Sequence, residues 1–369
     1  MISIFNLSVL PLSLRSLPKI PLVFPTFSTL SSISLSSSGM EENPPSLLVL
    51  SGKSSSENEL ALSLRNSSNL KLLDGHPLSI LLRSEMHTPS EDDQSTFQIE
   101  SYMDTLSTER FGRFLIWSPR MPSTHDLVSQ NFCELPLYSV CVTDIQFKGR
   151  GRSKNAWDSP IGCLMFSFTL QMENGHIVPL LQYVVSLAMT EAINTVCEKI
   201  GLPHLDVKIK WPNDLYLNGL KVGGILCTST YKSKKFNVSA GIGLNVDNEK
   251  PTTCLNAMIR KLTSTYQLKR EHILAEFFNK FEILFDVFMS QGFQALEDLY
   301  YKTWLHSGQK VVIEERNEGQ SIENIVVTIQ GLTPSGYLLA IGEDNNKYEL
   351  HPDGNSFDFF KGLVRRKVQ

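Results

Sequence analysis

Three short segments with basic side chains stand at the edges of predicted β-strands. They span residues 149–157, 210–214 and 221–224, and the first and third also contain glycines. Backbone N–H groups in glycine turns, together with arginine and lysine side chains, form good receptors for phosphate or carboxylate oxygens. The three segments therefore predict a binding site for a small anionic ligand.

Each segment also has a plainer interpretation, because charged loop residues are usually solvated. Trp157 is either a core residue or a side chain that stacks on a flat ring. Asp214 either fixes a turn through nearby backbone or holds Mg²⁺ through oxygen. The stretch SGKSS at 51–55 is not a phosphate-binding loop, because the glycine required five residues before Gly52 is absent.

Composition argues against several classes of protein. The net charge of the 369 residues is −4, whereas a general nucleic-acid binder normally carries a basic excess. The six cysteines are widely spaced without a CxxC pair, which argues against a structural zinc site and against disulfides. No Ser/His/Asp or Cys/His set indicates a covalent nucleophile. No run reaches about 18 apolar residues, so we expect no membrane span.

The first 39 residues differ from the rest of the chain. They contain 11 serines, two basic residues and no acid, and four prolines interrupt their apolar run. This make-up is typical of an organellar transit peptide, for chloroplast or mitochondrion, rather than of a secretory signal. Met40 opens an acidic sequence. It is either a second start that gives a cytosolic form or an ordinary residue near the processing site.

The elements that must position the basic segments become clear from about residue 105. Residues 40–104 are an extension of uncertain structure, with a candidate strand and turn at 46–56 and a short helix at 57–67. Residues 105–305 read as one α+β domain, because strand and helix periodicities alternate there. Its predicted strands span 136–147, 163–172, 206–210 and 236–246, and its predicted helices span 178–200 and, as one or two helices, 271–305.

Two local signals complete this layout. Asn218-Gly219 lies between alternating apolar runs and predicts a tight hairpin, because both turn positions need positive φ. The strand 236–246 contains two glycines, which allow a close approach to its backbone. Residues 306–369 contain short alternating strands separated by turn residues, which predicts a small β-barrel.

Taken together, these segments resemble the biotin–protein ligases, or holocarboxylase synthetases. The motifs occur in the family's order from about residue 110 to 365, and GLTPSGYLLA at 331–340 is similar to its SH3-like cap domain. The resemblance implies an α+β fold, with a class II synthetase-like mixed sheet and helices plus a small C-terminal SH3-like β-barrel. The matching motifs are ST at 123–124, QFKGRGR at 146–152, WDSPIGCLMFS at 157–167, KWPNDLYLNGLKVGGIL at 210–226 and GIGLNV at 241–246.

The resemblance also implies a two-step activity. Biotin and Mg·ATP give biotinyl-5′-AMP and pyrophosphate, and the adenylate then acylates a specific lysine on the biotin carrier domain of a carboxylase. A carboxylate is a poor electrophile, so it must first be joined to AMP. Lysine, arginine and Mg²⁺ neutralise the negative charges that this step brings together. No enzyme nucleophile is needed, which agrees with the sequence.

Site residues follow from the same resemblance, position by position. The catalytic residues are Lys221, which contacts the activated carbonyl or phosphate, Arg152, and Lys210, which reaches the phosphates. Asp214 holds Mg²⁺, and Trp157, Asn213 and Asn245 bind ATP or lie by its adenine. The residues implied to bind biotin are Ser123, Thr124, His125, Gln146, Gly149, Arg150, Gly151, Arg152, Lys221 and Gly224, the last by leaving room for it.

Some positions depart from the family pattern. His125 stands where bacterial members commonly have asparagine, and Lys154 and Asn155 replace arginines of the bacterial loop.

The DNA-binding winged helix of bifunctional bacterial ligases is not apparent in 41–104, so we expect neither nucleic-acid nor membrane partners. The alternatives are a lipoate– or octanoate–protein ligase of the same fold and a nucleic-acid-binding protein that uses the basic loop. An inactive scaffold would be expected to have lost Lys221 or Arg152, and both are present.

Overall fold

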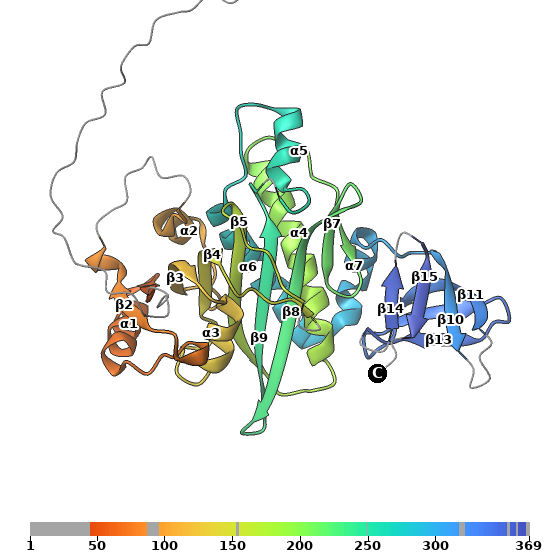
Figure 1. Ribbon diagram of the computed structural model, residues 1–369, viewed down its shortest axis with the longest axis horizontal. Helices are drawn as coiled ribbons and strands as arrows, with labels where there is room; N and C mark the ends of the chain where they lie inside the picture. The colour runs from red at the N-terminus through yellow and green to blue at the C-terminus, as the bar shows by residue number, and fades with distance from the viewer. Residues whose placement is uncertain are drawn as a thin grey trace, which may run out of the picture. The chain divides into compact units, whose positions relative to one another are not determined.

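The chain forms two β-sheets and their covering helices (Figure 1). The computed structural model describes residues 45–86, 96–152, 155–248, 250–316, 322–352, 355–358 and 361–366. The predicted targeting segment 1–39, Met40 and Lys154 lie outside these residues.

The larger sheet has nine strands and carries the site. Its strand order is β2-β1-β3-β4-β5-β9-β8-β7-β6. The pairs β1/β2 and β3/β4 are parallel and the other neighbours are antiparallel, so the sheet is mixed, as expected. The strands are β1 Ser46–Gly52, β2 Leu78–Leu82, β3 Phe114–Met121, β4 Val140–Gln146, β5 Cys163–Met172, β6 Val207–Lys210, β7 Asp214–Leu217, β8 Leu220–Lys232 and β9 Lys235–Asn245.

Most predicted strands are observed, but one is shorter than expected. The strand predicted over 136–147 begins only at Val140, because Tyr138 has a φ of 69° and Ser139 N donates to Pro136 O in a turn. The Asn218-Gly219 hairpin is confirmed between β7 and β8, with φ values of 50° and 76°. Both are in the left-handed region that this turn requires.

Residues 46–82 form one edge of the large sheet, and the candidate strand and short helix of this extension are confirmed as β1 and α1. Strand β1 pairs with β3 on one side and with β2 on the other. Leu48 and Leu50 contribute to an apolar cluster with Ala61 and Leu64 of helix α1, whereas Val49 belongs to the main core. This alternation places successive side chains on opposite faces of the sheet.

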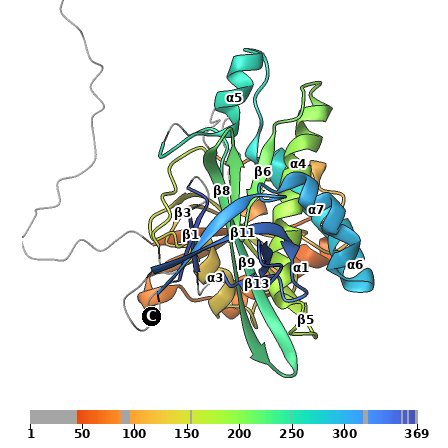
Figure 2. The same cartoon turned by 90° about the vertical axis from the view of Figure 1, so that its right-hand side faces the viewer.

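Helices cover both faces of the large sheet. Helices α4 and α6 pack together and contact β8 and β5, and they run behind the strands in Figure 1 and to their right in Figure 2. Helix α3 contacts β4, β5 and β9. The helices are α1 Ser55–Ser67, α2 Ile99–Thr105, α3 Thr124–Gln130, α4 Leu181–Lys199, α5 Leu255–Leu262, α6 Arg270–Gln291 and α7 Glu297–Thr303, with 3₁₀ turns at Leu73–Gly75, Arg83–Glu85, Val178–Leu180 and Phe293–Leu296.

Aromatic packing fixes helix α6 on the sheet. Phe277, Phe278 and Phe281 are fully buried, and their rings contact those of Phe166 and Phe168 on β5. Each such ring contributes about 1.5–3 kcal/mol by leaving water.

The predicted helical region 271–305 forms two helices, and Gly292, with a φ of 77°, ends the first.

Helix α4 lies in this core as well. The segment Val178–Lys199 is long and apolar enough to cross a membrane, a feature that the sequence analysis did not expect. However, 78% of its most apolar window is buried inside the protein. Its apolar side chains are accounted for by packing against the sheet and α6.

The C-terminal residues form a separate six-stranded sheet. Its strand order is β13-β12-β11-β10-β15-β14. The β-rich C-terminal domain expected from the alternating pattern is confirmed. Its strands are β10 Lys310–Arg316, β11 Ile322–Leu332, β12 Leu338–Gly342, β13 Lys347–Leu350, β14 Asn355–Asp358 and β15 Leu363–Arg366.

Candidate active site

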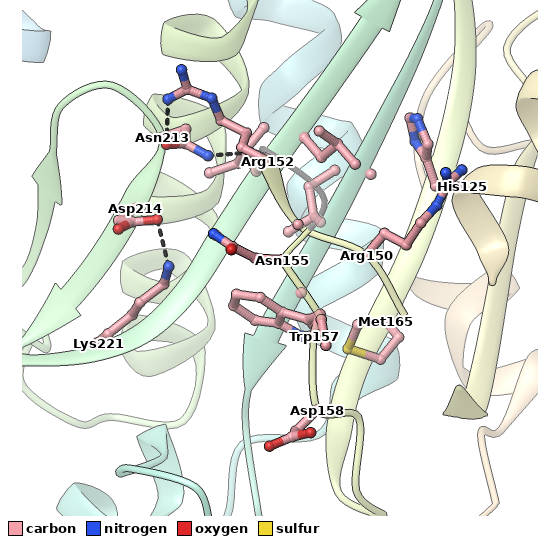
Figure 3. Close-up of a pocket in the computed structure, with 18 of the residues that line it drawn as sticks. His125, Arg150, Arg152, Asn155, Trp157, Asp158, Met165, Asn213, Asp214 and Lys221 are labelled. Atoms are coloured by element: carbon pink, nitrogen blue, oxygen red, sulfur yellow. Dashed lines mark hydrogen bonds and ion pairs between the residues drawn. The ribbon is translucent and has the colours of Figure 1, made fainter. Parts of the chain in front are cut away.

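A cavity of about 550 Å³ collects the predicted site residues (Figure 3). It is lined by helix α3, the loop 149–157, strands β5 to β9 and, from the C-terminal domain, Pro352. Gly149 is the predicted site residue that does not line it, and lies at the base of the loop. Those that do are Ser123, Thr124, His125, Gln146, Arg150, Gly151, Arg152, Trp157, Lys210, Asn213, Asp214, Lys221, Gly224 and Asn245.

One end of the cavity is a buried network of neutral polar groups. Ser123 caps helix α3 and accepts from Asp126 N at 3.2 Å. Thr124 donates to Gln146 Oε1 from its backbone N at 2.8 Å and its hydroxyl at 3.1 Å. The same hydroxyl lies 2.9 Å from Ser167 Oγ. This end therefore presents oriented donors and acceptors, which suits a small ligand with both amide-like N–H and C=O groups.

His125 forms a wall of the same end. Its Nε2 lies 3.0 Å from Thr228 Oγ1, and its buried Nδ1 has no hydrogen-bond partner among the described residues. Burial, and then the charge of Arg150, lower the pKa of His125 from 6.5 to about 4. The imidazole is therefore neutral near pH 7, and its Nδ1 lies against Gly241 of β9.

The described arms of the loop, residues 149–152 and 155–157, are held together at two places. Trp157 N donates to Gly149 O at 2.9 Å, and Gly151 N donates to Asn155 O at 2.8 Å. Arg150 forms an ion pair with Asp126, whereas Arg152 Nη1 donates to Asn213 Oδ1 at 3.1 Å. Figure 3 shows the two arginines on opposite sides of the cavity. The structure therefore separates two side chains that were both predicted to bind biotin.

Trp157 lies flat against two glycines of the sheet. A Cβ on Gly243 would lie 2.6 Å from the indole, and one on Gly224 would lie 3.1 Å from it. The space at Gly224 that was expected to admit biotin is thus occupied here by the indole. The buried Nε1 of Trp157 has no partner within the described part of the chain. The close approach predicted for the glycines of 236–246 is confirmed.

The other end of the cavity carries the charged groups. Lys221 Nζ lies 2.7 Å from Asp214 Oδ1 and 5.2 Å from the ring of Trp157. Lys210 is half-buried, and its pKa is lowered, first by burial and also by Lys221, against the opposing charge of Asp214. No group of three or more His, Cys, Asp or Glu side chains gathers for a metal among the described residues. Asp214 is thus a single carboxylate beside two ammonium groups.

Two asparagines brace the charged end. Asn213 Nδ2 donates to Ile225 O at 2.6 Å, and Ile225 N donates to Asn213 O at 2.8 Å, which ties the start of β7 to β8. Asn245 Nδ2 donates to Thr253 O at 3.1 Å. Only 5% of Asn245 is exposed, so it shapes the adjoining loop as well as lining the cavity.

Comparison with known proteins assigns the chain to a family. Residues 117–245 match the Biotin/lipoate A/B protein ligase family, and residues 306–362 match the Biotin protein ligase C terminal domain. The chain is 65% identical over 338 residues to "Biotin--protein ligase 1, chloroplastic" of Arabidopsis thaliana, across 91% of this chain and 92% of that protein. The chain belongs to the biotin–protein ligase family.

More distant relatives agree with this assignment. The biotin–protein ligase of Homo sapiens is 32% identical over 283 residues, which are 73% of the present ligase and 38% of the human protein. A mutant biotin protein ligase from Aquifex aeolicus, solved in complex with biotin, is 25% identical and superposes with a TM-score of 0.51. That match covers 64% of the present ligase and 94% of the bacterial chain. The chain is therefore an enzyme of the ligase class.

Several residues of this biotin–protein ligase's cavity were missed by sequence reasoning. Ser167 faces the polar end from β5, and Pro352 reaches the cavity from the C-terminal domain. Ser167 lies in a strand that was predicted, but nothing in its local pattern distinguishes it from other buried hydroxyls. Pro352 gave no signal, because its contribution depends on how the C-terminal sheet packs on the larger domain.

Proposed function

We propose that this ligase activates biotin with ATP and transfers the biotinyl group to a lysine of a carrier protein. The observation that carries the proposal is one cavity with a buried neutral polar end and a cationic end, joined by the loop 149–157. A neutral ring and an anionic tail require this combination. No covalent enzyme intermediate is invoked, in keeping with the chemistry of an adenylate.

In the first step, a carboxylate oxygen of biotin attacks the α-phosphorus of ATP. A bond forms between that oxygen and phosphorus, the bond to the β-phosphate oxygen breaks, and pyrophosphate leaves. Both reactants are anions, so charge stabilisation and fixed orientation account for most of the acceleration. Lys221 on β8 and Lys210 on β6, the two strands that flank β7 at the cationic end, are suited to supply that charge.

The polar end is proposed to bind the ring of biotin. Ser123, Thr124 and Gln146 offer hydroxyl and amide groups to its ureido N–H and C=O groups. His125 adds a neutral ring nitrogen, whose proton position adapts to the partner it meets. Their exposed fractions are all 9% or less, so water competes little with the ligand.

Arg152 and the lysines are proposed to act on the phosphates. Arg152 is tethered to Asn213, which also braces β7 against β8, so its guanidinium is held near the cationic end. Lys221 is proposed to exchange its ion pair with Asp214 for contact with the transferred phosphate or carbonyl oxygen. Arg150, which is held by its ion pair with Asp126, is proposed to contact the carboxylate of biotin.

Asp214 fits a site for Mg²⁺ that is held mainly by substrate. Magnesium commonly uses one or two protein carboxylates and takes its other ligands from phosphates and water. The side chain of Asp214 is 19% exposed and lines the cavity, so ATP in the cavity could reach a cation bound there. When bound, Mg²⁺ neutralises charge on the phosphates of ATP. Asp214 would hold the ion, and Lys221 would then be free to contact the substrate.

The adenine of ATP is proposed to lie against the indole of Trp157. The indole is wide enough to stack on adenine, and Asn213 and Asn245 line the same cavity and are proposed to supply polar groups to the nucleotide. Because the indole now covers Gly243 and Gly224, stacking on ATP requires either its outer face or a shift of the ring. Gly149 and Gly151 give the intervening loop the backbone freedom for such a shift.

The second step is proposed to be aminolysis of the adenylate. The ε-amino group of an acceptor lysine attacks the biotinyl carbonyl, an amide bond forms, AMP leaves and the lysine loses a proton. The proposed acceptors are biotin carrier domains of carboxylases. The chloroplastic name of the Arabidopsis relative supports plastid targeting through residues 1–39, with a cytosolic form starting at Met40 as the second proposed product.

Biotin-dependent exchange of labelled pyrophosphate into ATP tests the proposal. Protein starting at Met40 should exchange label only when biotin and Mg²⁺ are present, and should then modify one lysine of a carrier domain. Exchange with lipoate or octanoate but not with biotin would replace the substrate. Binding of nucleic acid without any exchange would overturn the enzymatic proposal altogether. Fusion of residues 1–39 to a fluorescent protein tests targeting, and a uniform cytosolic signal would exclude it.

A further inference from the structure

Leu305 and His306 form hydrogen bonds with the two residues that flank Lys210 in the sequence. Leu305 N donates to Ile209 O at 2.9 Å, and Trp211 N donates to His306 Nε2 at 2.9 Å. Lys210 lies between these two anchored residues at the end of β6, the outermost strand of the large sheet. An edge strand has no neighbouring strand on its outer side, so these contacts fix its end.

His306 is built to accept that hydrogen bond. It is fully buried, and its Nδ1 lies 2.9 Å from Gln309 Oε1. Since an amide oxygen only accepts, Nδ1 carries the proton and Nε2 is the acceptor for Trp211 N. Burial lowers the pKa of His306 to about 4, so the ring stays neutral near pH 7. Replacing the ring by an apolar group would leave a buried N–H unsatisfied.

The same region joins the C-terminal domain to the cationic end of the cavity. The indole Nε1 of Trp211 lies 2.9 Å from Tyr183 Oη and 3.3 Å from Gly336 O, which belongs to the turn before β12. The polar end of the cavity is built instead from α3, β4 and β5. A disturbance at His306 is therefore transmitted first to Lys210 and only remotely to the groups around Thr124.

We propose that His306 is a positioning residue that aligns Lys210 with the phosphates of ATP through the backbone of Trp211. The inference rests on the proposed function, because it assumes that Lys210 contacts ATP. A displacement of about 1 Å at a reacting group is enough to lower a rate by about 100-fold. The predicted signature is a defect in the use of ATP with the use of biotin preserved.

Two substitutions separate the hydrogen bond from packing. His306→Phe keeps a buried ring but removes the acceptor, whereas His306→Gln keeps an acceptor oxygen. Pyrophosphate exchange is measured with ATP and biotin varied in turn. We expect kcat/KM for ATP to fall by about 10- to 100-fold in the phenylalanine variant and much less in the glutamine variant. KM for biotin should stay close to that of the wild-type protein in both.

Control variants guard against a purely structural effect. Tyr301→Phe removes the hydroxyl that accepts from Leu332 N, a contact with the C-terminal sheet that does not involve Lys210. It should lower the melting temperature without changing KM for ATP. If His306→Phe does not fold, Gln309→Leu loosens the same ring from its other side and should shift the ATP parameters in the same direction.

Specific outcomes would overturn the inference. They are a wild-type kcat/KM for ATP in folded His306→Phe, or equal increases in KM for ATP and in KM for biotin, or a glutamine variant as impaired as the phenylalanine variant. A wild-type protein that shows no biotin-dependent exchange would instead contradict the proposed function, so the two failures are distinguishable.

Discussion

Lys221 Nζ lies 2.7 Å from Asp214 Oδ1, so the residue proposed to contact the transferred phosphate and the residue proposed to hold Mg²⁺ neutralise each other. Asp214 begins β7 and Lys221 lies one turn later on β8. The Asn218-Gly219 hairpin thereby brings together two side chains that lie on opposite sides of the turn in the sequence. Substrate and Mg²⁺ together would satisfy both partners when the pair separates.

Lys221→Met tests the role of the ammonium. Loss of one fixed charge that stabilises the transition state typically lowers a rate by about 100- to 1000-fold, so pyrophosphate exchange should fall by that amount. The side chain of Lys221 is 36% exposed, and an ion pair with such exposure contributes only about 0–1 kcal/mol to stability. The melting temperature should therefore change little. Lys232→Met, at the exposed end of the same strand, is the matched control and should exchange normally.

Alanine at two glycines of β9 should separate the two ends of the cavity. A Cβ at Gly243 would lie 2.6 Å from the indole of Trp157, whereas one at Gly241 would lie 3.1 Å from His125 Nδ1. Gly243→Ala should raise KM for ATP by displacing Trp157, and Gly241→Ala should raise KM for biotin. Isothermal titration with each ligand measures the dissociation constants, which should rise in the same pattern. Equal effects of both substitutions on both ligands would contradict the assignment of the two ends.

The ion pair between Arg150 and Asp126 predicts how the loop is held. The carboxylate side chain of Asp126 is 5% exposed, while Arg150 is 51% exposed. Asp126→Asn should release Arg150 and loosen the loop at its biotin end, so KM for biotin should rise and limited proteolysis within 149–157 should become faster. Arg152→Lys, which affects the tether at Asn213, should instead alter the use of ATP. Unchanged proteolysis in Asp126→Asn would argue against the ion pair as an anchor.

Two buried histidines predict a loss of stability in mild acid. Burial lowers the pKa values of His125 and His306 from 6.5 to about 4, so between these values the unfolded chain binds protons that the folded protein does not. The free energy of unfolding should therefore fall as the pH drops from 6.5 towards 4. Asp144 opposes this over part of the range, because burial raises its pKa to about 6 and the folded protein takes up that proton first.

Melting temperatures at pH 7, 6 and 5 measure this dependence. The two histidines should outweigh the single aspartate, so the wild-type protein should melt at progressively lower temperature. The double variant His125→Asn, His306→Gln should show a flatter profile, although its stability at pH 7 should be lower. An equally steep profile in the double variant would place the pH dependence on other groups.

Much of this protein was predictable from local sequence patterns. Alternating and 3.6-residue periodicities identified β5, β9 and α4 nearly to the residue, because side-chain direction follows backbone geometry within a few positions. The Asn218-Gly219 turn was predicted because few residue pairs adopt two successive positive φ angles. The ordered motifs also indicated the family, which the comparisons show.

Only the tertiary structure decided which of those groups meet. Trp157 covers Gly243, Arg150 turns to Asp126 rather than towards Arg152, and residues 46–82 complete the edge of the sheet. His306 reaches Trp211 from 95 positions along the chain. None of these contacts follows from local propensity, because each depends on strand order and on packing between distant segments. The sequence by itself determined the local elements and the chemical groups, and the packing of the sheet, its covering helices and the C-terminal domain determined their arrangement as one site.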